Sequence, residues 1–387
     1  MFDFYLYDTC SLYIVLLTFF VLYVSYFFAF SFRGIILDFM FFLLLLFCFF
    51  VFSFSNGFLL YVSYEASLLP IIYIIVKWGS YPERSLRALM LLLYTSVFSF
   101  PLIAGLFLLY SSLFSFYFTL FFPLYCPPLV LSLILFFSFS VKLPIYGLHY
   151  WLPIAHVEAP TFGSIILAGV LLKLGGVGLI RFLYLLDLPT LKTFLLSYFL
   201  VFLFFSSLLC CIQSDFKRLV AYSSVAHIIA VPLSLFSCCS ISLKTALCLM
   251  LFHGISSPIL FSLVGLIYSF SSSRQLVLVR GLLLISPLLS FVLVFSFLFT
   301  LSAPPYVSFF SEVLFFVVTL FSTAYSLPFL VGFALLCLIY NLNWLSSFLF
   351  NSVSYFHSSA VFSYSFALPI FLLHLASFFF LFLCCLI

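Results

Sequence analysis

The chain has 387 residues, of which 67% are hydrophobic and only 6% are charged, and its formal net charge is +4. A soluble domain carries about 25% charged residues, so this composition excludes a soluble protein with a polar surface. The positive charge is not gathered in a basic tract, which argues against nucleic-acid binding. Apolar runs of about 20 residues recur throughout, each long enough to cross a hydrocarbon core of about 30 Å. They are apolar on all sides, which favours transmembrane helices over the alternating strands of a membrane barrel.

The apolar runs divide into twelve expected spans, so the sequence predicts an all-α polytopic membrane protein. In chain order the spans are 11–32, 35–54, 57–76, 86–122, 129–156, 160–181, 193–213, 218–236, 241–269, 277–325, 328–349 and 361–386. The first run is expected to remain as a membrane helix, because Asp3 and Asp8 stand where a cleavable signal would be positively charged.

Basic residues are distributed unevenly between the two sets of loops. Loops and span edges after odd-numbered spans carry Arg33, Lys77, Arg84, Arg87, Lys217, Arg218, Arg274 and Arg280. Those after even-numbered spans carry only Arg181, Lys192 and Lys244. Because cytoplasmic or matrix loops are enriched in Lys and Arg, the odd-numbered loops are expected inside and both termini outside.

Two spans have proline near their middle, namely Pro144 in one and Pro304 with Pro305 in the other. Proline removes a backbone donor and interrupts the helical ladder. Discontinuous helices at matching positions are typical of transporters built from inverted repeats. The sequence therefore predicts two inverted five-helix repeats, each with its broken helix fourth. The expected units are an N-terminal helix in 1–34, repeats at 35–182 and 193–349, and a C-terminal helix in 361–387.

Four ionisable residues lie deep within expected spans: Glu65, Lys142, Lys173 and Glu312. Such a residue costs at least about 2.5 to 3.5 kcal/mol at the membrane centre, so it is usually paired, hydrated or functional. Burial disfavours the charged form of a lysine, whereas a nearby carboxylate favours it. We expect Glu65 to control the charge of Lys142, Lys173 to pass a proton along the midplane, and Glu312 to end the row. The alternative is a set of ion pairs that only hold helices together.

Three histidines lie on or near the same spans: His149, His227 and His253. A single intramembrane histidine is often only a hydrogen-bonded core residue. Beside lysines and glutamates it can instead relay protons, because imidazole exchanges a proton near neutral pH.

The remaining composition contains no sign of a redox centre. The eleven cysteines form no CxxC or metal-spaced cluster, so no metal, flavin or haem site is expected in this chain. The 61 Phe and 24 Tyr, together with many Leu, Ser and Cys, have thymine-rich codons and indicate the biased genome of an organelle.

Several motifs resemble the subunit 4 family of NADH:ubiquinone oxidoreductase, respiratory complex I. The most specific is VKLPIYGLHYWLPIAHVEAPTFGSIILAGVLLKLGG, from Val141 to Gly176. The others are YEASLLP and KWGSYPER between Tyr64 and Arg84, QSDFKRLVAYSSVAH from Gln213 to His227, HGISS from His253, and PPYVSFFSEV from Pro304. The HVEAP and PER elements favour subunit 4 over its relatives, subunits 2 and 5.

The resemblance implies an antiporter-like fold and proton translocation across the mitochondrial inner membrane, coupled to NADH oxidation by ubiquinone. By motif, the family's four intramembrane charges fall on Glu65, Lys142, Lys173 and Glu312, and its histidines on His149 and His253. NADH, FMN, the iron–sulfur clusters and ubiquinone would then bind other subunits. The expected partners are the antiporter-like chains 2 and 5 and a phospholipid such as cardiolipin.

The sequence also departs from the family's pattern. The family usually has fourteen helices, so two N-terminal helices are expected to be missing, their place filled by another subunit or by lipid. Tyr81, Ile154 and Ser311 stand where Gln, Lys and Gly are usual, and Pro258 is added after HGISS.

Two other functions fit the same residues. The first is a cation/proton antiporter subunit outside complex I, which shares this fold. The second is a scaffold that transports nothing, in which the buried charges only connect helices.

Overall fold

The computed structural model describes residues 9–350 apart from 115, 118–127, 146, 187–188, 238, 240 and 305, and it also describes residues 370 and 374. In these residues the chain is built from helices, and its only strand-like pairings are two isolated bridges. The α-helices are α1 (Thr9–Phe28), α2 (Ile35–Ser53), α3 (Gly57–Ala66), α4 (Leu68–Trp78), α5 (Arg84–Leu113), α6 (Leu129–Ser140), α7 (Trp151–Glu158), α8 (Thr161–Ile166), α9 (Leu172–Arg181), α10 (Pro189–Ile212), α11 (Phe216–Phe236), α12 (Ser242–Ser271), α13 (Leu282–Ile285), α14 (Pro287–Thr300), α15 (Val307–Ser322) and α16 (Leu327–Leu349). A π-helical turn, η4 (Leu167–Leu171), joins α8 to α9.

Within the described residues, nine helical segments are long and apolar enough to cross a membrane. Three shorter apolar helices lie at 129–140, 287–300 and 308–322. The first of these pairs with α7, and the other two pair with each other, which gives two crossings that are each broken in the middle. The all-α, multi-pass architecture is thus confirmed. The expected last span, 361–386, lies outside the described residues except for 370 and 374, and Pro305 lies outside them as well.

Two expected spans are longer than the membrane helices that form there. The span at 86–122 was wrong at its end, because α5 stops at Leu113 and Phe114 takes the left-handed conformation that terminates a helix. The span at 277–325 was wrong at its start. Gly281, also left-handed, precedes the four-residue α13, and the membrane helix α14 begins only at Pro287. Proline fits this first position because the backbone N–H that it lacks would have no helical partner there.

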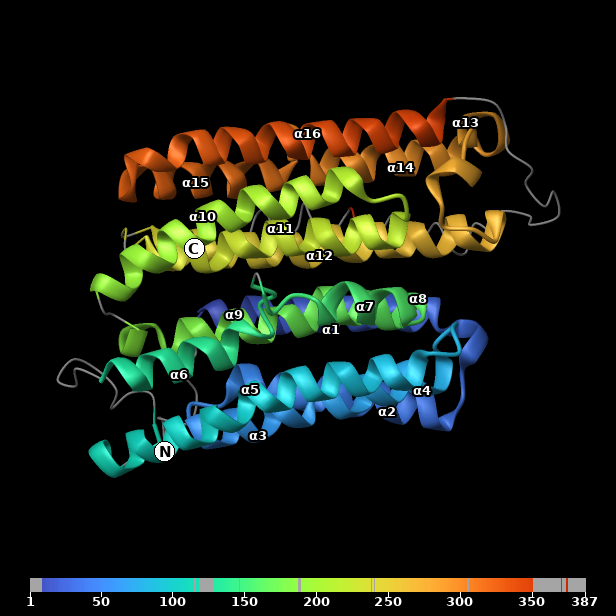
Figure 1. Cartoon of the computed structure of the whole chain (residues 1–387). Coiled ribbons are helices and arrows are strands. Elements are labelled where there is room, and N and C mark those ends of the chain that lie inside the picture. Colours follow the sequence, from blue (N-terminus) through green and yellow to red (C-terminus); the bar gives the residue numbers. More distant parts are fainter. Residues whose placement is uncertain are drawn as a thin grey trace.

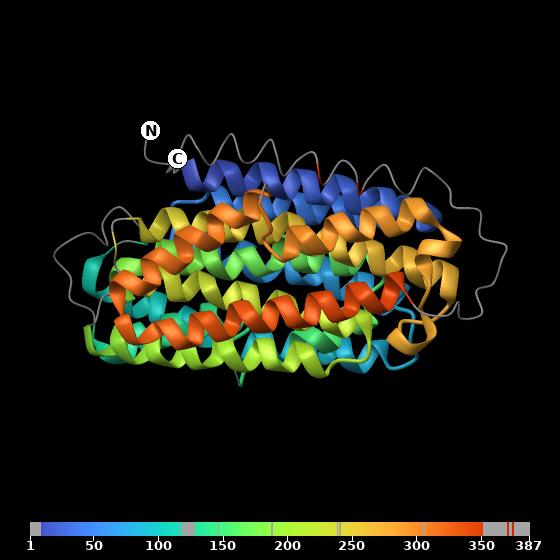
Figure 2. The same ribbon diagram turned by 90° about the horizontal axis from the view of Figure 1, so that it is seen from above.

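The helices lie side by side along one common direction, with α2 to α5 on one side and α14 to α16 on the other (Figure 1). The segment 161–181, α11 and α12 are almost wholly buried between them. Helix α1 packs against these buried helical segments at positions occupied by glycine. The Cβ positions of Gly169 and Gly254 face Val21 and Leu17 of α1 at 2.5 Å, so only glycine permits this approach. Seen from above, α16 lies beside α10 (Figure 2), where Gly332 meets the ring of Phe204.

The helices α5 and α12 share an unusual set of features. Each has 30 residues, and each contains one internal proline, Pro101 in α5 and Pro258 in α12. Each ends on a non-glycine residue in the left-handed region, Phe114 and Ser272 respectively. In the expected repeats, α5 and α12 are both the third helix, and they run in opposite directions in Figure 1.

The two isolated bridges also occupy matching places. Asn56 pairs with Tyr117, and Asp215 pairs with Gln275. In each pair, the first residue precedes the second helix of its expected repeat and the second residue follows the third helix. These features support the division into repeats at 35–182 and 193–349, which stays a prediction, as do the N-terminal unit 1–34 and the C-terminal unit 361–387.

Candidate functional site

Lys142 lies where the first broken helix is interrupted. Helix α6 ends at Ser140, and the irregular segment 141–150, which includes Pro144, separates it from α7. Trp151 at the start of α7 donates its indole N–H to the carbonyl of Val141 over 2.9 Å. That bond satisfies a carbonyl left without a helical partner at the end of α6, so the tryptophan fixes the geometry of the break beside Lys142.

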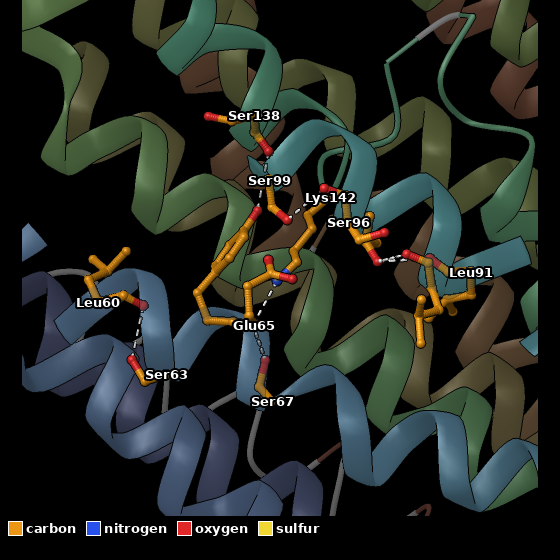
Figure 3. A network of polar contacts seen from close by, with 12 residues as sticks. Leu60, Ser63, Glu65, Ser67, Leu91, Ser96, Ser99, Ser138 and Lys142 are labelled. Carbon is orange, nitrogen blue, oxygen red and sulfur yellow. Dashed lines mark hydrogen bonds and ion pairs between the residues drawn. The ribbon is translucent and has the colours of Figure 1, made fainter. Parts of the chain in front are cut away.

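The ammonium of Lys142 faces three groups from α3. Its Nζ lies 3.8 Å from Oε1 of Glu65, donates to the carbonyl of Tyr64 over 2.8 Å, and lies 2.9 Å from the centroid of the Tyr64 ring. The Lys142 side chain is buried, whereas 23% of the Glu65 side chain is exposed. Figure 3 shows the lysine reaching across to Glu65. An anion, a dipole and a ring face together offset the loss of hydration of the cation.

The helix carrying Glu65 is itself interrupted two residues later, at Ser67. Helix α3 ends at Ala66 and α4 begins at Leu68. Pro70 has no N–H to offer the carbonyl four residues before it, which accounts for the interruption at Ser67. The hydroxyl of Ser67 donates to the carbonyl of Tyr64 over 2.8 Å, so this carbonyl accepts from both Ser67 and Lys142. The predicted pair thus lies between two local breaks.

Lys173 lies in the buried centre, two residues beyond the π-helical turn. Its Nζ donates to the carbonyl of Ala168 over 2.6 Å and lies 3.1 Å from Nδ1 of His253 in α12. Single π turns are frequent at functional sites, and here one supplies a carbonyl to the lysine. A Cβ at Gly254 would lie 3.2 Å from Cε of Lys173, so glycine makes room for the lysine against α12.

The row continues from His253 to Glu312. The rings of His253 and His227 have centroids 6.5 Å apart, and Nδ1 of His227 lies 3.5 Å from Oε1 of Glu312. All three side chains line a cavity of about 30 Å³ together with Ser256, Ser302, Ser308, Ser311 and Thr300. Since one water needs about 10–15 Å³ on this measure, the cavity has room for about two. Water there could connect the two imidazoles.

The second break holds Glu312 against this cavity. The residues between α14 and α15 include Pro304, and Ser302 is left-handed with φ 53°. Ser308, in the first turn of α15, donates to the carbonyl of Phe299 over 2.8 Å, which satisfies a carbonyl at the end of α14. Each broken helix thus has a side chain that caps its first half, as Trp151 does at the first break.

The predicted row is joined in two parts. One is the pair of Glu65 and Lys142, and the other runs from Lys173 to Glu312. Between the parts, in the portion of the chain that the structure describes, no hydrogen bond or ion pair connects Lys142 to Lys173. They are connected by packing, because Leu143 lies against Gly175, where a Cβ would come within 2.9 Å of its side chain.

The arrangement can be compared with known proteins. Residues 55–339 match the family described as NADH:quinone oxidoreductase/Mrp antiporter, transmembrane. This match covers most of the chain and includes every residue of the row. The chain belongs to this family.

Curated relatives within this antiporter family are similar to the chain over two thirds of its length. NADH-ubiquinone oxidoreductase chain 4 of Lumbricus terrestris is 38% identical over 269 residues, which are 67% of this chain and 59% of the relative. The protein of the same name from Artemia franciscana is 40% identical over 262 residues, 67% of this chain and 66% of the relative. The chain thus aligns with about six tenths of the length of these relatives.

A solved structure has the same fold as this chain. A chain of respiratory complex I from Thermus thermophilus with bound NADH superposes with a TM-score of 0.84. The alignment covers 96% of this chain and 80% of that chain at 23% sequence identity. At this identity the likeness concerns the fold alone.

His149, the third predicted histidine, lies in an aromatic environment in this antiporter-family chain. Its buried ring stacks on Tyr150 with a centroid distance of 4.5 Å and contacts the rings of Phe202 in α10 and Tyr222 in α11. A role of His149 in proton transfer stays a prediction.

A second polar cluster was not singled out from the sequence. It consists of Arg87, Glu158, Lys217 and Arg274. Arg87 Nε lies 3.2 Å from Glu158 Oε1, and Lys217 and Arg274 both donate to the carbonyl of Val157 over 3.1 Å. Its sequence signal was in two of the motifs, because HVEAP contains Glu158 and QSDFKRLVAYSSVAH contains Lys217. Among the described residues, no group of three or more His, Cys, Asp or Glu could hold a metal ion.

Proposed function

We propose that this chain is an antiporter-like subunit of NADH:ubiquinone oxidoreductase, corresponding to subunit 4, and that it moves protons across the mitochondrial inner membrane. The observation that carries the proposal is the contact row Lys173–His253–His227–Glu312. Each member can bind and release a proton, and the row runs through the buried centre of a multi-pass membrane protein. The names of the curated relatives, NADH-ubiquinone oxidoreductase chain 4, support the assembly.

In this proposal, the pair of Glu65 and Lys142 loads the proton. The carboxylate stabilises the ammonium form of Lys142 at 3.8 Å. If Glu65 is neutralised or moves away, the buried ammonium loses its counter-charge, and the amine then releases its proton more readily. The breaks on both sides of the pair give the helices the freedom for such a movement.

The released proton would pass to the amine of Lys173 and then along the row. From the ammonium of Lys173 it transfers to Nδ1 of His253 over 3.1 Å. It leaves the imidazole at the other nitrogen, crosses the small cavity to His227 and reaches the carboxylate of Glu312 from Nδ1. Each step leaves the donor neutral, each imidazole must then turn its ring to restore the starting tautomer before the next proton, and the net result is one proton moved from Lys142 to Glu312.

The redox chemistry belongs to other subunits in this proposal. NADH, FMN, the iron–sulfur clusters and ubiquinone would bind elsewhere in the complex, and their reactions would drive the change at Glu65. The neighbours would be antiporter-like chains 2 and 5, with a phospholipid such as cardiolipin in the grooves between them.

Replacing Lys142 by Met tests the proposal. The complex carrying this variant is purified, reconstituted into liposomes and supplied with NADH and a quinone, and internal acidification is measured with a pH-sensitive dye. We expect pumping to fall at least tenfold in assembled complex. Lys77→Met is the matched control, because Lys77 is exposed over the rings of Tyr73 and Trp78, and it should pump normally. Wild-type pumping by Lys142→Met would favour the scaffold function instead.

A cation/proton antiporter outside complex I is the second candidate, because the description of the matched family covers both kinds of protein. Isolation of the native assembly separates the two. Flavin and iron–sulfur absorbance that co-purifies with the chain indicates complex I. An assembly without them, whose proton flux requires sodium or potassium, indicates the antiporter.

A further inference from the structure

His156 is a buried imidazole that the proposed row does not use. It lies in α7, in the sequence HVEAP, and its side chain has no exposed surface. Its ring stacks on Phe261 of α12 with a centroid distance of 4.4 Å and an interplanar angle of 10°. Within the described residues, neither ring nitrogen has a hydrogen-bond partner. Two buried nitrogens without a partner are costly, so this group in a native protein calls for an explanation.

The position of His156 along α12 places it between the row and one end of the helix bundle. His253, in the row, precedes Phe261 by eight residues on α12, which is about 12 Å along the axis. Tyr268 follows Phe261 by seven residues, about 10 Å further. His156, stacked on Phe261, therefore lies about midway between His253 and Tyr268.

Tyr268 borders a large cavity at this end of the bundle. The cavity has a volume of about 350 Å³ and is lined by Tyr81, Val157, Asp215, Lys217, Tyr268, Ser272, Ser273, Arg274, Gln275 and Leu278. Val157 is the residue next to His156 in the chain. The cavity is wide enough for many waters, and it reaches one residue away from the buried imidazole.

Cationic groups lie near the imidazole at both ends of this path. Lys217, at the cavity, and Lys173, in the row, are both close enough to repel a positive charge on His156, so an imidazolium there would pass its proton on readily. Lys217 is buried and donates to the carbonyls of Val157 and Ala159 over 3.1 and 2.6 Å, so it lies against the two residues that flank Glu158.

We propose that His156 conducts protons between the large cavity and the Lys173–His253 part of the row. This inference rests on the proposed function and adds to it a second path, which reaches the row without passing through Lys142. Water in the cavity delivers a proton to one ring nitrogen, which gives an imidazolium. The imidazolium releases a proton from its other nitrogen toward Lys173 or His253. A turn of the ring then restores the starting tautomer, so that one proton has crossed and no group has changed.

The charge distribution assigns a side of the membrane to this path. Lys217 and Arg274 line the cavity, and both belong to the loops that the excess of Lys and Arg places inside. The cavity therefore opens to the matrix, the side from which a proton pump takes protons up.

The first experiment compares His156→Phe with Phe261→Leu in complex reconstituted into liposomes. Phenylalanine keeps the ring stack but cannot carry a proton, so we expect pumping to fall at least fivefold. Phe261→Leu removes the stacking partner and keeps the imidazole, and pumping should stay within twofold of wild type. If His156→Phe does not assemble, His156→Gln is measured in its place. Normal pumping in the assembled His156 variant overturns the inference.

The second experiment uses charge at the cavity, because a purely structural histidine would not respond to it. Gln275 lines the cavity and is exposed, so Gln275→Cys can be labelled with cationic or anionic thiol reagents from the matrix side. A cationic label should slow pumping by repelling protons, and an anionic label should not. The unsubstituted protein, treated in the same way, is the control. Equal effects of both labels contradict the inference.

The two proposals can fail separately. If Lys142→Met abolishes pumping while His156→Phe pumps normally, the proposed function holds and the second path is wrong. If both Lys142→Met and His156→Phe pump normally, the proposed function fails and this inference fails with it. If Lys142→Met pumps normally and His156→Phe does not, protons enter the row through His156 and the loading role of Lys142 is wrong.

Discussion

Lys173 and His253 are 80 residues apart in the chain, and their side chains meet at 3.1 Å in the buried centre of the molecule. The lysine comes from the helix that follows a π-helical turn, and the histidine comes from the middle of the 30-residue α12. Because Gly254 follows the histidine, the lysine can approach α12 closely. This contact joins residues from the two expected repeats, so it is the point at which a proton would pass from one half to the other.

Replacing His253 by Gln should interrupt the row at this contact. Glutamine can still accept a hydrogen bond from Lys173, so the buried lysine keeps a polar neighbour, but an amide cannot carry a proton. We expect pumping by the reconstituted complex to fall at least tenfold, with assembly on a native gel preserved.

Ser256→Ala is the matched control for this change. Ser256 lines the same cavity and donates to the backbone carbonyl of His253, and its hydroxyl is not a proton carrier in the row. It should pump within twofold of wild type. Normal pumping by His253→Gln would show that protons do not pass through this contact.

Substitutions of Tyr64 should distinguish the roles of its ring and its hydroxyl. The Lys142 ammonium lies over the ring face, whereas the hydroxyl makes a long contact of 3.5 Å with the carbonyl of Ser138. A buried cation–π contact contributes about 2 kcal/mol. Tyr64→Phe should therefore pump almost as wild type, and Tyr64→Leu should lower the pumping rate about tenfold. Equal rates in the two variants would mean that the ring does not stabilise the cation.

The sequence was sufficient to predict the kind of fold and one contact in the site, the pair of Glu65 and Lys142. Apolar length predicted the membrane helices, and Pro144 marked the first break. Glu65 and Lys142 were predicted as a pair and lie 3.8 Å apart. These predictions succeeded because buried charges and prolines are costly in lipid, so each one in a span carries information.

Other contacts could not be predicted from the sequence, because they depend on the register between helices. His227 was predicted only as a relay member, and its contact with Glu312 depends on how α11 meets α15. His156 was not singled out because a histidine at the end of a span could equally lie in water. The segment at 277–325 is too long for a single crossing, but the start of its membrane helix could not be placed, because residues 276–285 are as apolar as that helix, although they form only short turns.

Gly178→Ala should destabilise the packing beside the first break. A Cβ at Gly178 would lie 2.2 Å from the ring of Phe139, which is wholly buried at the end of α6 and cannot move aside. Overpacking of this kind costs about 1–3 kcal/mol. We expect less assembled complex and a thermal inactivation midpoint several degrees lower. Gly34→Ala is the control, because no atom lies within 4 Å of its Cβ position, and it should behave as wild type. Unchanged thermal inactivation of Gly178→Ala would contradict the packing.

Arg181→Met should weaken the attachment of α2 to the rest of the molecule. The guanidinium of Arg181, at the end of α9, donates to the carbonyls of Val51, Phe52 and Phe54, which lie at and just beyond the end of α2. These carbonyls have no helical partner, and a cation at a helix C-terminus is stabilising. Without the guanidinium they stay unsatisfied in an apolar setting, which costs about 1–3 kcal/mol. We therefore expect the thermal inactivation midpoint of the purified complex to fall.

Arg181→Lys should lie between wild type and Arg181→Met, since one ammonium keeps the charge but cannot span three carbonyls as the planar guanidinium does. Arg33→Met serves as the control for a lost arginine, because Arg33 is exposed and its guanidinium lies over the rings of Tyr26 and Phe30. It should leave the midpoint unchanged. If Arg181→Met inactivates at the wild-type temperature, the end of α2 does not depend on this guanidinium, and α2 must be held by its apolar contacts alone.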